Sequence, residues 1–189
     1  MAVDAWSEKA LVSITKIGGT DVEFCTKTTS IDISGGGQDT ETVRTFCGDI
    51  TRLNPQEPFE ISLDVVPVYA DDFDSIYFGG TDTTQPLEFT AGTSRDKYRV
   101  VILWTTDTTV TSATAATTAG EEAYRLIFAE CYAVSFDKTY DADGYLQGTI
   151  TFKCSAKDKS GDPNVAVQSD DGSGTGLAAL NPYTSTTKW

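Results

Sequence analysis

Carboxylates are the main side chains of this sequence that could do chemistry. The 189 residues include 28 Asp and Glu and four Cys, but no His. Triads and dyads that use an imidazole base are therefore excluded, and a cysteine nucleophile lacks its usual base. Two carboxylates across a cleft could still cleave a glycosidic bond, but no spacing in the sequence points to such a pair. We predict that the protein is not an enzyme and uses no cofactor.

Three short motifs resemble ligand sites, and each has a simpler explanation. The segment Asp141–Gly144 begins like a calcium loop, but Phe152 stands where a bidentate Glu is required, so turn chemistry explains it better. The segment Gly35–Gly37 lacks the flanking residues of a phosphate-binding loop and is typical of a flexible loop base. The three aspartates within Asp71–Asp74 could bind a divalent ion, but acids are also typical of a first helical turn. We therefore predict no metal site.

The cysteines Cys25, Cys47, Cys131 and Cys154 are far apart and form no CxxC pair. A zinc site without histidine would need all four thiolates, and their spacing resembles no common zinc module. We interpret them as small buried apolar residues of a protein in a reducing cytosol. Cys131 and Cys154 lie on opposite arms of a predicted hairpin and could be neighbours, which leaves a late disulfide open.

The charge of the chain limits its partners. The net charge is −14, and twelve acidic residues but only three arginines lie between Asp39 and Asp96. We expect no binding of nucleic-acid phosphates by charge, because such affinity comes from Lys and Arg. The acids form either a solvated face or a surface that repels a polyanion. The N-terminal residues MAVDAWSEKA contain no apolar segment, so we expect no signal peptide, and no apolar run is long enough to span a membrane.

The elements that must position these residues are mainly strands. Pro58–Val66 alternates strictly between apolar and polar residues, whereas Tyr98–Thr105 is apolar on both faces and is predicted to be central. In Ala123–Cys154, two runs rich in β-branched and aromatic residues meet at the turn dipeptide Asp143-Gly144, which predicts one long hairpin. Its first arm, Tyr124–Phe136, would span about 40 Å, against about 20 Å for a usual strand.

The first third of the chain combines short strands with a long loop. Strands are predicted at Ala10–Ile17, Asp21–Cys25 and Thr28–Ile33. The segment Ser34–Pro58 is long and polar, with a strand-like insert around Val43–Phe46. Loops of this length in a compact domain are usually functional or ordered by a partner.

The remaining segments complete the predicted fold class. Spacings of three and four between apolar residues predict one short helix at Asp71–Phe78. A further strand is predicted at Leu87–Thr90, and Thr108–Gly120 is predicted to be a mobile loop or hairpin tip. We predict a mainly β protein, an antiparallel β-sandwich or partial barrel with one short α-helix and long loops. Residues 1–156 would form the β-sandwich, and 157–189 a flexible or docking C-terminal tail.

The order and the residue patterns of these segments resemble those of a known family. IDISGGGQDTETVRTF followed by PFEISLDVV, and later FAECYAVSFDKTYDADGYLQGTITFK, resemble the major tail (tail tube) proteins of long-tailed bacteriophages. The resemblance covers Ala10–Ala156 and includes no catalytic motif. It implies six-membered rings, in which each subunit adds strands to an inner β-barrel, and stacking of rings into a hollow tube through which DNA passes. Related tubes occur in contractile injection and type VI secretion systems.

The resemblance also implies roles for particular residues and partners. The loop that reaches the next ring would contain Gly35, Gly36, Gly37, Asp39, Glu41, Arg44 and Arg52. From alternation alone, the lumen candidates are Glu60, Asp64, Thr149 and Thr151. The expected partners are further copies of the chain and the tape-measure, tail terminator and baseplate-proximal proteins, with no membrane and no specific DNA binding. The protein would be made in the host cytoplasm and reside in the virion tail.

Physical arguments favour the same assembly. A large sheet with one wet face has edges, which natural proteins hide by pairing them or closing the sheet. An acidic lumen would keep phosphates from sticking within about 8 Å at physiological salt. The alternative is a non-catalytic β-sandwich binding protein or a capsid decoration protein. A register slip of one residue would reverse every assignment of facing.

Overall fold

The computed structural model describes residues 9–23, 28–66, 76, 96–139 and 147–189. These residues form ten strands, and all their pairings are antiparallel. The strands are β1 (Lys9–Lys16), β2 (Asp21–Glu23), β3 (Thr28–Gly35), β4 (Thr40–Thr45), β5 (Gly48–Leu53), β6 (Phe59–Val65), β7 (Tyr98–Thr105), β8 (Glu122–Thr139), β9 (Gln147–Cys154) and β10 (Val165–Asp171). The predicted mainly β, antiparallel fold class is confirmed.

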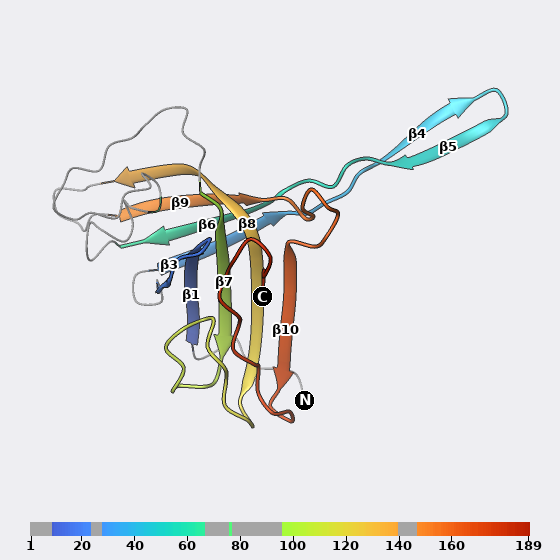
Figure 1. The fold of residues 1–189 in the computed structure, drawn as a ribbon. Helices are drawn as coiled ribbons and strands as arrows, with labels where there is room; N and C mark the ends of the chain where they lie inside the picture. The colour runs from blue at the N-terminus through green and yellow to red at the C-terminus, as the bar shows by residue number, and fades with distance from the viewer. Residues whose placement is uncertain (1–8, 24–27, 67–75, 77–95, 140–146) are drawn as a thin grey trace.

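Eight of these strands form one sheet that bends into two layers. The order is β2-β1-β7-β8-β9-β6-β3, and β10 also pairs with β8. We call the part made of β2, β1, β7, β10 and the first half of β8 sheet A. The part made of β9, β6, β3 and the second half of β8 is sheet B. The strands of sheet B run across those of sheet A (Figure 1), and the described sheet is not closed.

Strand β8 passes from one layer to the other. Its first half pairs with β7 and β10, and its second half, from Tyr132, pairs with β9. Two register shifts each place an extra residue in β8, and Glu130 at the first shift has a φ of 55°. Such bulges bend a strand and are typical of corners where a strand changes sheets. The long hairpin predicted for Ala123–Cys154 therefore pairs only from Tyr132 onward, and its turn lies outside the described residues.

The main core lies between the two sheets. Side chains such as Val12, Val100 and Ile102 of sheet A pack against Ile61 and Leu63 of sheet B.

A second cluster covers the other face of sheet A. Val101 and Leu103 of β7 are fully buried there beside Ala113 and Leu177. Both faces of β7 are therefore buried, as predicted for Tyr98–Thr105. The segment Thr108–Gly120, predicted to be mobile, instead packs on this face through Val110 and Ala113.

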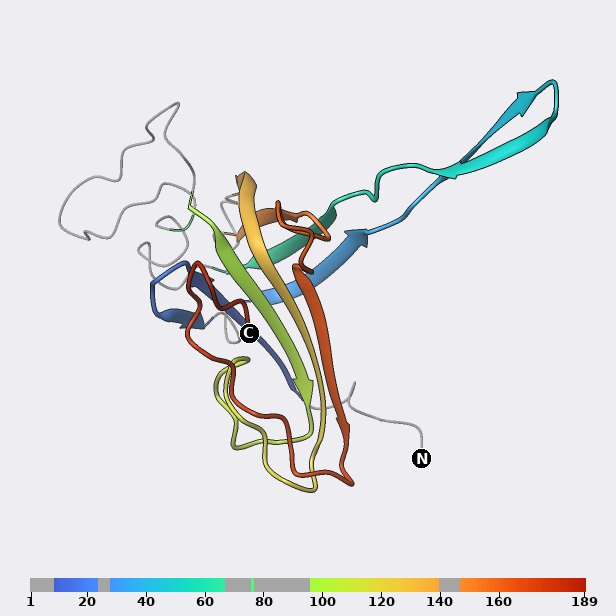
Figure 2. The same cartoon turned by 45° about the vertical axis from the view of Figure 1, so that its right-hand side comes forward.

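The long polar loop predicted at Ser34–Pro58 is largely a hairpin. Strands β4 and β5 pair with each other along their whole length and with no other described strand. They extend away from the two sheets as an arm (Figures 1 and 2). The predicted insert around Val43–Phe46 corresponds to β4 and the following turn, and its partner β5 was not predicted.

Two predicted elements fall on residues that the structure does not describe. Only Ile76 of the predicted helix Asp71–Phe78 is described, and its side chain is buried in the main core. The predicted strand Leu87–Thr90 lies outside the described residues. Within the described part of the chain, no helix is long and apolar enough to cross a membrane.

Candidate assembly surfaces

The outward face of sheet B carries all four residues that alternation marked as lumen candidates. In the register of β6 with β9, Glu60 is opposite Lys153, Asp64 is opposite Thr149, and Ser62 is opposite Thr151. The intervening residues, such as Leu63 and Ile150, point into the core. The structure therefore places Glu60, Asp64, Thr149 and Thr151 on one face of sheet B, where Asp64 is exposed, Glu60 and Thr149 are half-buried and Thr151 is buried. That this surface lines a lumen stays a prediction.

Hydrogen bonds order the side chains across this polar face. Asp64 accepts from the hydroxyls of Ser30 at 2.5 Å and Thr149 at 2.6 Å. These two hydrogen bonds, with Ser30 the larger contributor, lower the pKa of the Asp64 carboxyl, so it stays ionised at neutral pH. A hollow of about 260 Å³ next to it is lined by polar residues including Asp137 and Gln147. The face is thus a wet, carboxylate-bearing surface.

The charge on this face is mainly negative. Asp32 on β3 and Asp137 on β8 are exposed, and the register places them on the same face as Glu60 and Asp64: Asp32 is opposite Ser62, and Asp137 is opposite Thr149. Lys153 forms an ion pair with Glu60 at 2.9 Å. The negative charge of these four carboxylates therefore exceeds the positive charge of Lys153.

Sheet B ends in two strands that run in opposite directions. In the order of the described strands, β3 lies at one end and the second half of β8 at the other. Tyr132 and Val134, on the second half of β8, are 40% and 41% exposed. Partly exposed apolar side chains at the end of a sheet are typical of a surface that meets another chain.

The arm contains the residues predicted to reach a neighbouring ring. Gly35, Gly36, Gly37 and Asp39 lie at its base, and Glu41, Arg44 and Arg52 lie on its two strands. Every residue of β4 and β5 is exposed.

The glycines at the base of the arm are required by close contacts. A Cβ on Gly35 would collide with the carbonyl oxygen of Pro58, and one on Gly36 would collide with the ring of Phe59. Both glycines have a positive φ, of 87° and 74°. Gly35–Gly37 was predicted to be a flexible loop base; in the structure Gly35 ends β3, and Gly35 and Gly36 pack closely against Pro58 and Phe59 where the arm begins.

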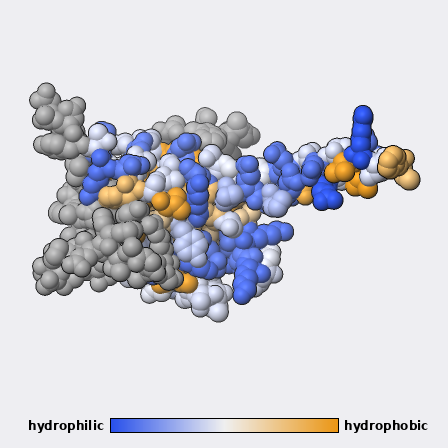
Figure 3. Space-filling model, turned by 90° about the horizontal axis from the view of Figure 1, so that it is seen from above, coloured by the Kyte–Doolittle hydropathy of each residue, from blue (hydrophilic) through white to orange (hydrophobic). Residues whose placement is uncertain are grey.

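The arm also exposes apolar side chains that the sequence analysis did not single out. Phe46, at its tip, is fully exposed, and three further residues of the arm are exposed to at least 39%: Val43, Ile50 and Leu53. Figure 3 shows orange groups on the projecting arm, between hydrophilic side chains. The sequence indicated them only as isolated apolar residues within the polar segment Ser34–Pro58. In strands β4 and β5, Glu41 and Asp49 balance Arg44 and Arg52, so Thr40–Leu53 is electrically neutral in a chain of net charge −14.

The C-terminal residues 177–189, which we call the strap, lie against sheet A. Two buried arginines donate to its main chain: Arg99 to the carbonyls of Asn181 and Lys188, at 2.7 and 3.3 Å, and Arg125 to that of Ala178 at 2.7 Å. Burial, and secondarily the charge of Arg99, lowers the pKa of Arg125 to about 10. Neither arginine was predicted to have a role, although each interrupts an apolar run of the sequence.

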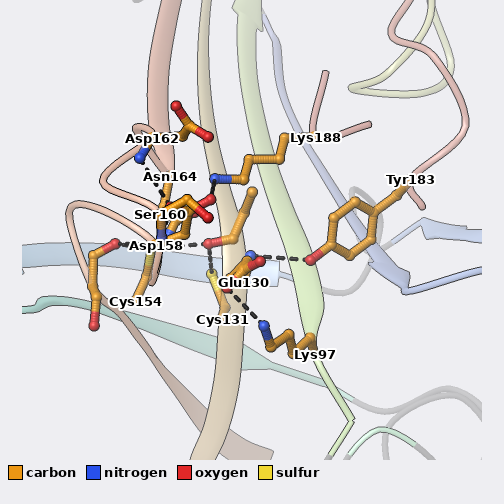
Figure 4. A network of polar contacts seen from close by, with 12 residues as sticks. Lys97, Glu130, Cys131, Cys154, Asp158, Ser160, Asp162, Asn164, Tyr183 and Lys188 are labelled. Carbon is orange, nitrogen blue, oxygen red and sulfur yellow. Dashed lines mark hydrogen bonds and ion pairs between the residues drawn. The ribbon is translucent and has the colours of Figure 1, made fainter. Parts of the chain in front are cut away.

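A polar network joins the strap to the corner in β8 (Figure 4). The Tyr183 hydroxyl accepts from the Glu130 amide at 3.1 Å, and burial raises the pKa of Tyr183 to about 12. Lys97 forms an ion pair with Glu130 at 2.7 Å. Lys188 forms an ion pair with Asp158 at 2.6 Å, in the loop between β9 and β10. The strap thus fixes the bulge that separates sheet A from sheet B.

The candidate ligand sites gain no support from the described residues. None of their His, Cys, Asp and Glu side chains form a group of three or more that could hold a metal ion. Asp71–Asp74 and Asp141–Gly144 lie outside the described residues. Cys131 and Cys154 are buried thiols, as predicted, but Cys47 is exposed at the tip of the arm. The prediction that the cysteines are buried is wrong for Cys47, because the loop that carries it is a projecting turn.

Comparisons with known proteins show the fold. A chain of the anti-feeding prophage (AFP) baseplate, 6-fold symmetrised, matches 89% of this chain and 97% of its own length, at 13% identity and a TM-score of 0.51. A chain of the PVC sheath/tube terminator of an extracellular contractile injection system matches 86% and 94%, at 17% identity and a TM-score of 0.49. A chain of the PVC sheath-tube complex matches 84% and 88%, at 17% and 0.47. No family model and no curated protein matches the sequence.

Proposed function

We propose that this chain is the structural subunit of a tail tube, in which copies close sheet B into a ring and the rings stack through the arm. The observation that carries the proposal is the form of sheet B. It has four strands, a core-packed face, a polar outward face, and β3 and β8 at its two ends. A sheet of this kind hides its ends most simply by pairing them with those of identical neighbours.

The direction of the strands fits such a ring. Along the order β8-β9-β6-β3 each strand opposes its neighbour, so β3 runs opposite to β8. In a ring with rotational symmetry all copies point the same way. The β3 strand of one copy would therefore meet the β8 strand of the next as an antiparallel pair. An even number of strands per copy is what allows the ring to remain antiparallel throughout.

The ring size follows as part of the proposal. The AFP structure of similar fold is 6-fold symmetrised, and six copies with four strands each give 24 strands. Strands about 4.8 Å apart, tilted by about 40°, would then enclose a backbone diameter of about 48 Å. Side chains of the polar face, including Glu60, Asp64, Thr149 and Thr151, would point into this channel. Its carboxylates would repel phosphates at short range, so DNA could pass without binding.

Stacking would use the arm. A two-stranded hairpin alone is marginally stable in water, and every residue of β4 and β5 is exposed in the single chain. A neighbouring copy would bury Phe46 and Ile50. The neutral arm would meet less repulsion from an acidic body than an acidic arm would. Gly35, Gly36 and Gly37 would set its direction, and the pairs Glu41–Arg52 and Arg44–Asp49 would keep its charges balanced.

The kind of particle that contains the tube is also part of the proposal. The sequence resembles the major tail protein of long-tailed bacteriophages, which would place the chain in a virion tail that ejects DNA. The similar structures come from an anti-feeding prophage and an extracellular contractile injection system. A tube of such a particle is the second candidate. In both cases the expected partners are further copies of the chain and the terminator, tape-measure and baseplate-proximal proteins.

Excision of the arm tests the proposal. The Asn54 amide donates to the Asp39 carbonyl at 2.8 Å, so two glycines can replace Thr40–Leu53 without disturbing the base. Electron microscopy of the concentrated wild-type protein is expected to show stacked rings or tubes, and the excised variant single rings. The substitution Phe46→Ser, at a fully exposed position, should weaken stacking without affecting the fold.

Three outcomes would contradict the proposal. A wild-type protein that stays monomeric at high concentration would favour the binding-protein or decoration-protein alternative. Unchanged tubes after excision would remove the arm from stacking. An excised variant without β structure by circular dichroism would show that the arm stabilises the monomer instead.

A further inference from the structure

Two buried thiols face each other where β8 leaves sheet A. Cys131 on β8 and Cys154 on β9 are 0% and 1% exposed and belong to the core between the two sheets. The Cys154 thiol donates to the Ala129 carbonyl at 3.1 Å, and the Cys131 thiol to the Phe128 carbonyl at 3.3 Å. Both side chains therefore point at the same bulge (Figure 4).

The register places the two cysteines opposite each other. Tyr132 pairs with Lys153 and Ala133 with Phe152, and one further step brings Cys131 opposite Cys154 on the core side. Opposed residues of antiparallel strands have Cα atoms about 4.5 or 5.5 Å apart, and a disulfide accommodates about 4.4–6.8 Å. The Cα separation of either type of antiparallel pair thus lies within the range of a disulfide.

We propose that Cys131 and Cys154 form a latent cross-strand disulfide, closed by a small peroxide when the corner opens locally. One thiolate attacks a peroxide oxygen, breaks the O–O bond and becomes a sulfenic acid, while the released hydroxide takes up a proton. The second thiolate then attacks the sulfenic sulfur. The S–O bond breaks, the S–S bond forms, and water leaves. Two thiols and one hydrogen peroxide give one disulfide and two waters.

The surroundings explain why the pair stays reduced until the corner opens. Both cysteines are buried in the closed structure. Burial, and then the contact with Cys154, raises the pKa of the Cys131 thiol well above its usual value, so the reactive thiolate is rare. Closure would bridge the 22 residues from 132 to 153 and fasten β8 to β9 beside the bulge at Glu130. The inference applies equally to a monomer and to a ring.

The experiment uses the full chain with Cys25→Ser and Cys47→Ser, which leaves only the proposed pair. The matched control adds Cys154→Ala, which keeps a small apolar side chain and one thiol. Both proteins are treated with millimolar hydrogen peroxide at pH 8 in native buffer, quenched with catalase, unfolded and alkylated with N-ethylmaleimide. Intact mass and peptide mass spectrometry then count the free thiols and locate any cross-link.

The pair-containing protein is expected to lose both alkylation sites and the mass of two hydrogens, with one cross-linked peptide joining residues 131 and 154. Its melting temperature should rise by about 5–10 °C, because the bridge restricts the unfolded chain. The control should show neither change. Sulfinic or sulfonic masses in place of the cross-link, or a cross-link that forms only in full denaturant, would overturn the proposal. If Cys154→Ala does not fold, Cys131→Ala serves as the control.

Discussion

The hydrogen bond from the Glu130 amide to the Tyr183 hydroxyl gives a direct test of how the strap holds the corner. Tyr183→Phe removes only the hydroxyl and keeps the ring, which lies 5.5 Å below the Arg99 guanidinium. The Glu130 amide is then left without its acceptor in a part-buried position. An unpaired polar group of this kind costs about 1–3 kcal/mol, and we expect the free energy of unfolding to fall by about 2 kcal/mol.

The assay is urea and thermal unfolding, followed by circular dichroism. A loss of about 2 kcal/mol corresponds to about 4–8 °C in melting temperature for a chain of this size, and to about 1 M in urea midpoint. The matched control is Tyr132→Phe, because Tyr132 is 40% exposed whereas Tyr183 is 2% exposed. Its expected change is below about 0.5 kcal/mol.

Hydrogen exchange adds a local readout for the same variant. The Glu130 amide should exchange faster in Tyr183→Phe, while the central amides of β7 should keep their relative protection. If the free energy of unfolding changes by less than about 0.5 kcal/mol and the Glu130 amide keeps its protection, the hydroxyl does not fix the bulge. An equal loss in Tyr132→Phe would show that the effect has nothing to do with the corner.

Two further predictions concern the ring contact and the acid stability of the fold. Val134→Lys is expected to prevent ring formation, because it places a charge where β8 would meet the next copy, while Val167→Lys, at a 54% exposed position on β10, should leave rings intact. Size-exclusion chromatography with light scattering measures this, and the reverse result would move the contact to β10. Asp107→Asn is expected to lower the free energy of unfolding at pH 7 by about 2 kcal/mol, whereas the exposed Asp39→Asn should change little. Hydrogen bonds, first from the Thr109 hydroxyl, lower the pKa of the buried Asp107. Its stabilisation is present above the unfolded pKa of about 3.9 and is lost as the pH falls through the lower folded value. The difference between wild type and Asp107→Asn should therefore narrow from pH 7 to pH 2, and a constant difference would contradict the assignment.

The strands could be predicted where burial repeats with a simple period. Tyr98–Thr105 is apolar on both faces because the core covers one face of β7 and the loop and strap cover the other. Pro58–Val66 alternates because sheet B has one dry and one wet face. The same alternation placed Glu60 and Asp64 correctly on one surface, since they lie on a strand without a register shift.

The bulge, the arm and the partners of the buried arginines could not be predicted, because they depend on contacts between distant residues that no local sequence pattern indicates. The bulge at Glu130 adds one residue to β8 and shifts its register with β7. The only trace of this bulge in the sequence is the run of apolar residues Ile127, Phe128 and Ala129 before an acid. The arm was predicted as a loop because exposed β4 and β5 have no dry face to alternate against. Arg125 interrupts an apolar run, but its partners could not be predicted from the sequence, because contacts such as those with the Ala178 carbonyl and the Gln168 side chain join residues far apart in the chain. The division at residue 156 stays a prediction.

The long β8 strand connects the part of the molecule held by the strap to the sheet that is proposed to close into a ring. Its first half is held in sheet A between β7 and β10, and its second half forms one end of sheet B. Because the two halves are one strand, a turn of sheet B relative to sheet A must bend β8, and the two bulges lie where it changes sheets. Tyr183 and Lys97 hold the first bulge from the side of sheet A. If sheet B closes into a ring, the strap therefore helps to set the curvature of that ring. It does so through its contact with the first bulge of β8 and not through a contact with β3.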